Sequence, residues 1–265
     1  MSDESPHPQT ASPSGVPHAI GAYVLWGFMP LYLLLVKQVP AFEFVGWRII
    51  WTLPICLLIV AFRGQFPAIR EALKDRRAVL VLTASAILIG VNWVVYVWAI
   101  QQNQVYAASL GYYINPLVNV LLGTMLLKET LSRAQWIAVA LAGVGIAVLA
   151  AGALTTLWIS LTLAFSFGTY GLLRKQVSVG ALPGLTIESA ILLLPALGVA
   201  AWFAASPAGS SFGSDLGLSL AIALGGALTA FPLLLFAIAA RRMDYSALGF
   251  VQFLAPSIVF VLGLT

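Results

Sequence analysis

Long apolar segments alternate with short polar ones along almost the whole chain. The nine apolar segments run approximately over residues 18–36, 42–62, 78–100, 105–127, 134–151, 155–173, 184–204, 216–239 and 244–265. Most of them are close to the roughly 20 residues that a helix needs to cross a bilayer. Only a few residues separate the fifth segment from the sixth, so these two are interpreted as a tight hairpin of two spans. The pattern therefore predicts an all-α integral membrane protein.

The composition supports this fold class. Hydrophobic residues make up 61% of the chain and charged residues only 8%, against about 25% charged residues in a typical soluble domain. Residues 1–15 differ from the rest, because they are polar, rich in Pro and Ser, and have no basic start. We interpret them as a disordered cytoplasmic tail rather than a signal peptide. The single cysteine, Cys56, excludes a disulfide within the chain.

Basic residues lie almost entirely in alternate connections between the spans. Eleven of the 13 Lys and Arg residues occupy the connections after spans 2, 4, 6 and 8: Arg63, Arg70, Lys74, Arg76, Arg77, Lys128, Arg133, Arg174, Lys175, Arg241 and Arg242. The opposite connections contain only Lys37, and Arg48 lies within span 2. Since cytoplasmic loops are enriched in Lys and Arg, the basic side and the N-terminus are predicted to face the cytoplasm across the inner membrane.

Two pairs of segments indicate an internal repeat. Residues 106–123 read YAASLGYYINPLVNVLLG, and residues 246–263 read SALGFVQFLAPSIVFVLG, so that Pro116 aligns with Pro256 and Gly123 with Gly263. A second pair starts at Tyr32 and at Tyr170, and it agrees at nearly the same offset. Matches in the same order and at nearly the same spacing indicate a duplicated chain, which in so apolar a sequence is typical of transporters.

The repeat and the topology together predict the architecture. Span 1 pairs with span 6 and span 4 with span 9, so the repeat unit has five spans. An odd number of crossings turns the second copy over, which predicts two inverted five-helix repeats. Their boundaries are 16–151 and 152–265, and the second repeat has four spans. The partner of span 5, a tenth span, is expected beyond Thr265, at roughly 274–291.

These segments resemble the RarD branch of the EamA family, within the drug/metabolite transporter superfamily. The resemblance extends from Tyr23 to Thr265. It rests on the following residues: Trp26-Gly27 and Pro30; Glu43, Arg48 and Trp51; Gly90, Asn92-Trp93 and Trp98-Ala99; Ala108-Ser109-Leu-Gly-Tyr-Tyr-Ile-Asn115-Pro116-Leu-Val-Asn119; Ala164-Phe-Ser-Phe167 and Tyr170-Gly171; Ile187-Glu188 and Leu194-Pro195; Leu248-Gly-Phe-Val-Gln252 and Pro256. The long string in span 4 is the most specific part.

The resemblance implies a ten-span permease that moves small metabolites, amino acids or drugs, commonly outward. RarD-like proteins often carry a chloramphenicol-sensitivity label, which does not establish a substrate. The sequence departs from the family pattern in lacking the tenth span.

Polar side chains share helical faces within several spans. In span 4, Ala108, Tyr112, Asn115 and Asn119 are spaced by four, three and four residues, so they line one face. Polar groups in the bilayer interior usually face the interior of the bundle or a wet cavity. We therefore predict that the substrate path is lined by Trp26, Asn92, Trp93, Tyr96, Tyr112, Asn115, Asn119, Tyr170 and Gln252. The alternative is that these side chains only hold neighbouring helices together.

Prolines and charges within spans are further candidates. Pro30, Pro116 and Pro256 are predicted hinges, because each proline removes a helical hydrogen bond. Glu43 and Arg48 are five residues apart in span 2, about 140° around a helix, so they cannot be assumed to pair. Glu43 is a candidate for proton coupling or for a charge anchor, or alternatively a residue that snorkels to the membrane boundary. Arg48 is interpreted either as an anchor for an anionic group or as part of an ion pair. Glu188 in span 7 is a candidate for proton coupling or, alternatively, a boundary residue.

Three classes of function fit such a bundle: a secondary transporter, an intramembrane enzyme, and a non-transporting receptor or assembly partner. The only histidines, His7 and His18, lie in or beside the tail, and no metal-ligand spacing or nucleophile–base arrangement occurs. No catalytic residue, metal or cofactor is therefore expected, and direct ATP drive is disfavoured. The sequence predicts a secondary transporter, with the receptor as the alternative. Its expected partners are the lipid bilayer and a small-molecule solute, with no nucleic acid; a homodimer is left open.

Overall fold

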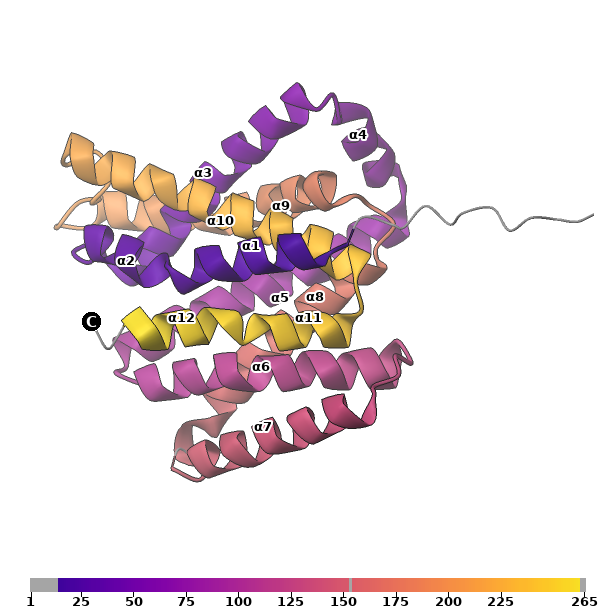
Figure 1. The fold of residues 1–265 in the computed structure, drawn as a ribbon. Helices are drawn as coiled ribbons and strands as arrows, with labels where there is room; N and C mark the ends of the chain where they lie inside the picture. The colour runs from indigo at the N-terminus through magenta and orange to yellow at the C-terminus, as the bar shows by residue number, and fades with distance from the viewer. Residues whose placement is uncertain (1–13, 153, 263–265) are drawn as a thin grey trace, which may run out of the picture.

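The computed structural model describes residues 14–152 and 154–262, and within this part the chain is a bundle of helices (Figure 1). Their bounds are α1 Val16–Gly27, α2 Met29–Leu33, η1 Leu34–Val36, α3 Ala41–Phe62, α4 Phe66–Lys74, α5 Arg76–Gln101, α6 Val105–Leu126, α7 Arg133–Ala151, η2 Leu154–Thr156, α8 Leu157–Gln176, α9 Ala181–Ala205, α10 Leu216–Arg242, α11 Tyr245–Gln252 and α12 Leu254–Leu262. The predicted tail at residues 1–15 lies almost wholly outside the described residues.

Eight candidate membrane spans follow from helix length and apolar composition. They are Val16–Val36, Ala41–Phe62, Arg76–Gln101, Val105–Leu126, Arg133–Ala151, Leu154–Gln176, Ala181–Ala205 and Leu216–Arg242. These correspond to the first eight predicted segments, so the chain is a multi-pass membrane protein. The ninth segment, predicted as one span, is instead divided between α11 and α12.

Two of the three predicted hinge prolines lie just after helix breaks. Proline removes one helical hydrogen bond and its ring crowds the carbonyl four residues earlier. For Pro256 that carbonyl belongs to Gln252, the last residue of α11, and for Pro30 it belongs to Trp26, next to the end of α1. Pro116, in contrast, lies inside the uninterrupted α6. Proline alone therefore does not determine where these helices break.

Helix α4 was not anticipated from the sequence. It lies in the basic connection between α3 and α5, with Pro67 in its first turn and only Ala72 buried. Its polar composition differs from the apolar pattern that predicted the other long helices. In Figure 1 it lies at one end of the bundle, on the side where α1 begins.

Helices α6 and α11 pack side by side and run in opposite directions (Figure 1). The start of α11 lies at the end of α6, where the Tyr245 amide donates to Glu129. Farther along the pair, Asn119 donates to Gln252 over 2.8 Å. A Cβ added to Gly249 would lie 2.7 Å from the Pro116 carbonyl oxygen, so the two backbones approach closely.

The core of the bundle is aromatic. Tyr23, Tyr170, Phe236 and Tyr245 are buried together, and Trp26 packs against them. None of the residues of helix α7 is buried, and it lies at the edge of the bundle next to α6 (Figure 1). Its apolar surface is suited to contact with lipid.

Candidate functional site

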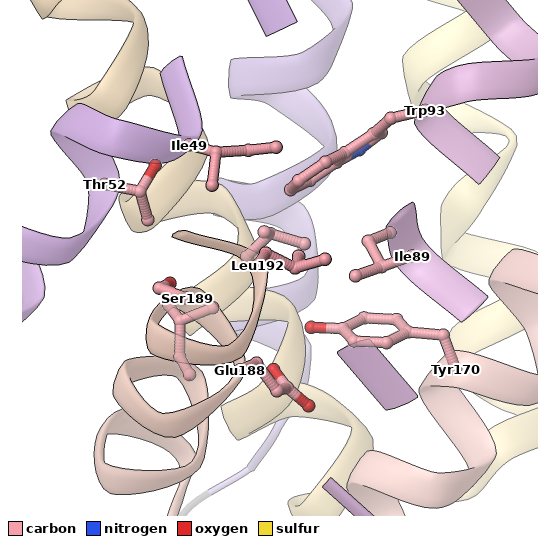
Figure 2. Close-up of a pocket in the computed structure, with 10 residues that line it drawn as sticks. Ile49, Thr52, Ile89, Trp93, Tyr170, Glu188, Ser189 and Leu192 are labelled. Carbon is pink, nitrogen blue, oxygen red and sulfur yellow. The ribbon is translucent and has the colours of Figure 1, made fainter. Parts of the chain in front are cut away.

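A small pocket lies among α3, α5, α8, α9 and α10 (Figure 2). It is lined by Ile49, Thr52, Ile89, Trp93, Tyr170, Leu185, Glu188, Ser189, Leu192 and Leu233. The cavity volume of about 10 Å³ is close to the minimum that holds one water molecule. A metabolite would enter this space only if the surrounding helices moved apart.

Glu188 provides the carboxylate of the pocket. Its side chain is 2% exposed and lies on α9. The Oε1 atom accepts a hydrogen bond from the Ser85 hydroxyl over 2.5 Å, whereas Oε2 has no hydrogen-bond partner among the described residues. The Tyr170 hydroxyl is close enough to interact with this carboxylate, and Figure 2 shows it directed into the pocket above Glu188. The carboxylate and the phenol thus face the same small space.

The ion-pair partner of Glu188 is Arg174, at the end of α8. The distance from its Nη1 to Oε1 of Glu188 is 3.6 Å, and the Arg174 side chain is fully buried. Its Nη2 donates to the carbonyl oxygen of Ala181 over 2.8 Å. A Cβ on Gly184 would collide with this guanidinium, so glycine leaves the space that the charge occupies.

Neither Arg174 nor Ser85 was among the predicted site residues. The sequence places Arg174 among the basic residues of the connections, because it is followed by Lys175 at the basic end of span 6. The pairing depends on a contact between α8 and α9, which neither helix shows in its own sequence.

Arg48 lies near the Trp93 ring and is not among the residues that line the pocket. It follows Ala41, the first residue of α3, by seven positions, or about 10 Å along the helix axis. The guanidinium carbon is 4.7 Å from the centre of the Trp93 ring and 6.0 Å from that of Phe44. Tyr32, Tyr96 and Tyr112 are near enough to interact with it electrostatically.

Glu43 is fully buried and makes no ion pair with Arg48. Its carboxylate accepts hydrogen bonds from the Ser210 and Ser211 hydroxyls and the Ser211 amide, over 2.6–2.7 Å. The Trp47 indole donates a fourth, over 3.3 Å. This carboxylate joins α3 to the connection between α9 and α10.

The predicted amides lie between helices rather than in the pocket of Figure 2. Asn92 donates to the Leu163 carbonyl oxygen, and Asn115 to that of Ala164, both on α8. Asn119 donates to Gln252. These contacts agree with the alternative interpretation, in which the amides hold the bundle together. Their place in a substrate path stays a prediction.

The predicted aromatic residues fall into three places. Trp93 and Tyr170 line the pocket. Tyr96 and Tyr112 lie near Arg48, and their ring centres are 5.7 Å apart. Trp26 packs in the aromatic core against Phe167.

At the basic end of the bundle, Glu129 caps the start of α11. Its carboxylate accepts from the Tyr245 and Ser246 amides and from the Ser246 hydroxyl, over 2.6–2.8 Å, and lies 4.0 Å from the Lys175 ammonium. Burial alone would raise the pKa of Glu129, but these hydrogen bonds and the Lys175 charge outweigh it, so the pKa lies below its ordinary value. No sequence signal singled out this residue.

Comparison with known proteins identifies the family. Residues 13–151 match the EamA-like transporter family. Protein RarD of Streptomyces exfoliatus is 41% identical over 94% of this chain and 79% of its own length. An uncharacterised transporter of Pseudomonas aeruginosa is 43% identical over 90% of this chain and 80% of its own length.

A solved crystal structure shows that the fold is a known one. It is 18% identical and has a TM-score of 0.73, covering 94% of this chain and 86% of that chain. The family follows from the family match and the relatives. The chain belongs to the EamA-like transporter family and is a RarD-like membrane transporter.

Proposed function

We propose that this chain is a secondary transporter that carries a small metabolite, amino acid or drug-like solute across the inner membrane by alternating access. Glu188 is the proposed proton-coupling carboxylate. The observation that carries the proposal is the buried Glu188, with one unsatisfied oxygen, at a closed pocket between helices of both halves of the chain.

The lining of the pocket supports two halves related by a two-fold axis. Three pairs of lining residues are separated by the same 140 positions as Pro116 and Pro256: Ile49 and Ser189, Thr52 and Leu192, and Trp93 and Leu233. Arg48 and Glu188 have this separation too. Such an arrangement is expected where an axis between inverted repeats passes through a central site.

Helix packing follows the same relation. Helices α3 and α9, which are equivalent under the repeat, pack on each other. The contact of α5 with α8 has its counterpart in that of α10 with α1, and the contact of α6 with α8 in that of α11 and α12 with α1. The halves therefore meet over similar surfaces, which suits a rocking motion.

Each side of the membrane has one carboxylate that joins the two halves. Glu129 and Glu43 belong to the first half, and they bind Ser246 at the basic end and Ser210 and Ser211 at the opposite end. Alternating access requires these two contacts to open in turn. Pro256 and Pro30, beside helix breaks, and Pro116 within α6 remain the proposed flexible points.

A proteoliposome experiment tests the coupling. A pH-sensitive dye trapped inside reports proton movement when amino acids, small carboxylates or chloramphenicol are added outside under an imposed pH gradient. We expect solute-dependent proton movement in the wild type and its loss in Glu188→Gln, because an amide carries no exchangeable charge. Glu71→Gln is the matched control, since Glu71 is exposed and pairs only with Lys74.

Proton movement unchanged in Glu188→Gln would remove this carboxylate from the mechanism. Solute exchange without proton movement in the wild type would instead favour an uncoupled carrier. No flux for any solute would favour the receptor alternative.

A further inference from the structure

Arg48 is a cation within a candidate membrane span without a counter-charge. Among residues 14–152 and 154–262, no ion pair or hydrogen bond to its guanidinium is found, and its Nε atom is buried without a partner. An ionised side chain in the bilayer costs several kcal/mol unless it is compensated. A cation kept there without a carboxylate is suited to a ligand that supplies one.

The two buried carboxylates within the candidate spans already have partners. Glu43 is held by two serine hydroxyls, an amide and an indole, and Glu188 is paired with Arg174. The Arg174–Glu188 pair is electrically neutral. The region between the outer end of α3 and the pocket therefore has one positive charge in excess.

The geometry leaves the hydrogen-bonding edge of Arg48 free. Its guanidinium carbon lies 4.7 Å from the centre of the Trp93 ring. An aromatic ring attracts a guanidinium without accepting a conventional hydrogen bond, and the N–H donors of arginine match the two oxygens of a carboxylate. No hydrogen bond from the Arg48 guanidinium is found among the described residues, so these donors remain available.

Aromatic side chains beside Arg48 offer a surface for a flat group. The Tyr96 and Tyr112 rings are 5.7 Å apart, and Tyr112 is 39% exposed, so it is reachable from outside the packed core. The Tyr32 hydroxyl already donates to the Ala221 carbonyl oxygen. Flat rings pack favourably against such side chains, in stacked or edge-to-face arrangements.

We propose that Arg48 binds the carboxylate of a small organic anion, whose flat apolar part lies against Tyr96 and Tyr112. The substrate class is thus a monoanionic aromatic or similarly flat carboxylate. A single guanidinium surrounded by neutral phenols fits one negative charge, whereas phosphate groups are typically bound by several cations. The binding of an anion at Arg48 does not depend on the proposed transport function. Only its interpretation as a substrate site rests on that proposal.

Binding is measured without transport, on the full chain in lipid nanodiscs. Radiolabelled benzoate is the probe, and benzamide, which has the same shape and no charge, is the competitor. We expect saturable benzoate binding that benzamide does not displace. Arg48→Gln is expected to weaken it about ten- to a hundredfold, and Arg48→Lys less, because lysine keeps the charge and loses the planar fork. Arg76→Gln is the control, since it removes an exposed charge from the start of α5.

A second measurement needs no variant. Phenylglyoxal modifies accessible arginines, and mass spectrometry reads the modification at each position. We expect benzoate, and not benzamide, to protect Arg48, while Arg76 is modified equally in all samples. Absence of saturable benzoate binding, equal protection by benzamide, or an Arg48 that phenylglyoxal does not reach would each overturn the inference.

The two proposals fail in different ways. If Arg48-dependent benzoate binding occurs and no solute crosses the liposome membrane, the anion site stands and the transport proposal fails. If a solute crosses the liposome membrane while wild type and Arg48→Gln bind benzoate equally, transport stands and the anion site is wrong.

Discussion

Arg174 and Glu188 show how much depends on a single buried charge pair. Arg174 is wholly buried and Glu188 is 2% exposed, and each is the only oppositely charged group found beside the other in the described chain. Removing one partner of such a pair leaves an uncompensated charge, which typically costs about 3–5 kcal/mol. Removing both charges avoids that cost.

We therefore expect Arg174→Gln to lower the free energy of unfolding more than the double variant Arg174→Gln/Glu188→Gln. The difference is expected to be about 1–3 kcal/mol, since neighbouring substitutions are not additive. Thermal unfolding in detergent, followed for both single variants and the double variant, gives the interaction energy. Additive effects would show that the two charges do not act as a pair.

Gly226 marks the close crossing of α10 and α3. A Cβ at this position would lie 2.5 Å from the carbonyl carbon of Trp51, and backbone atoms cannot move aside as a flexible side chain does. We expect Gly226→Ala to destabilise the protein by about 2–3 kcal/mol. Gly145→Ala is the control, because nothing lies within 4 Å of its added Cβ.

In the control, alanine is expected to stabilise α7 by up to about 1 kcal/mol through its higher helix propensity. Both variants are compared by their unfolding temperatures at the same detergent concentration. Equal shifts in the two would contradict the role assigned to the Gly226 contact.

Sequence spacing placed some candidates well and could not place others. The spacing of Tyr112, Asn115 and Asn119 predicted one helical face, but not whether that face meets a cavity or another helix. Asn115 and Asn119 meet helices, as their hydrogen bonds to Ala164 and Gln252 show. Whether a helical face meets a cavity or another helix depends on contacts between segments that are distant in the sequence. The sequence of one helix does not specify which residues of another helix lie opposite it.

At the scale of elements, the start of α11 depends on an acceptor from another part of the chain. The first amides of a helix have no partners within it. Its N-cap residue, Asp244, makes no capping bond with its side chain, and Glu129 supplies the acceptors instead. The helix is therefore stabilised by the connection that follows α6.

This arrangement predicts a dependence of stability on pH. Because the pKa of Glu129 is lowered in the folded protein, its contribution is fully present above the ordinary value of 4.5 and is lost as the pH falls through the lower folded value. We expect the unfolding temperature to decrease below about pH 4.5, and to decrease less in Glu129→Gln, which lacks the titrating group. Identical acid profiles would show that another carboxylate is responsible.

The apolar pattern predicted element type better than element continuity. The first eight segments correspond to long apolar helices. Hinges were predicted at Pro30, Pro116 and Pro256, and the helices break beside the first and the last of these, whereas α6 is continuous at Pro116. The polar helix α4 was not predicted. Hydropathy reports which residues avoid water, whereas a break depends on backbone hydrogen bonds near a proline and on the packing around them.

For the whole molecule, the position of the basic loops predicts the orientation in the membrane. The only cysteine, Cys56, is buried, so Cys56→Ala gives a background for single introduced cysteines. Ala208 and Arg76 are exposed and lie in opposite connections. In intact cells a membrane-impermeant maleimide is expected to label Ala208→Cys, and to label Arg76→Cys only after permeabilisation.

Labelling of Arg76→Cys alone in intact cells would reverse the orientation. The same pair of variants tests the proposed N-terminal location indirectly, because α1 begins at the end of the bundle where α4 lies (Figure 1). The inverted repeat itself remains a prediction. The antiparallel packing of α6 and α11 supports it, and superposition of the two halves measures it.

The small volume of the pocket bears on how readily protons leak across the membrane. Room for about one water molecule among Ile49, Ile89 and Leu192 does not accommodate a continuous file of waters, and an apolar constriction resists wetting. This pocket therefore does not hold a water chain along which protons could pass. Under the proposed coupling, a cell can keep many copies in its membrane without dissipating its electrochemical gradient, because proton entry would take place only with the helix movement that admits a solute.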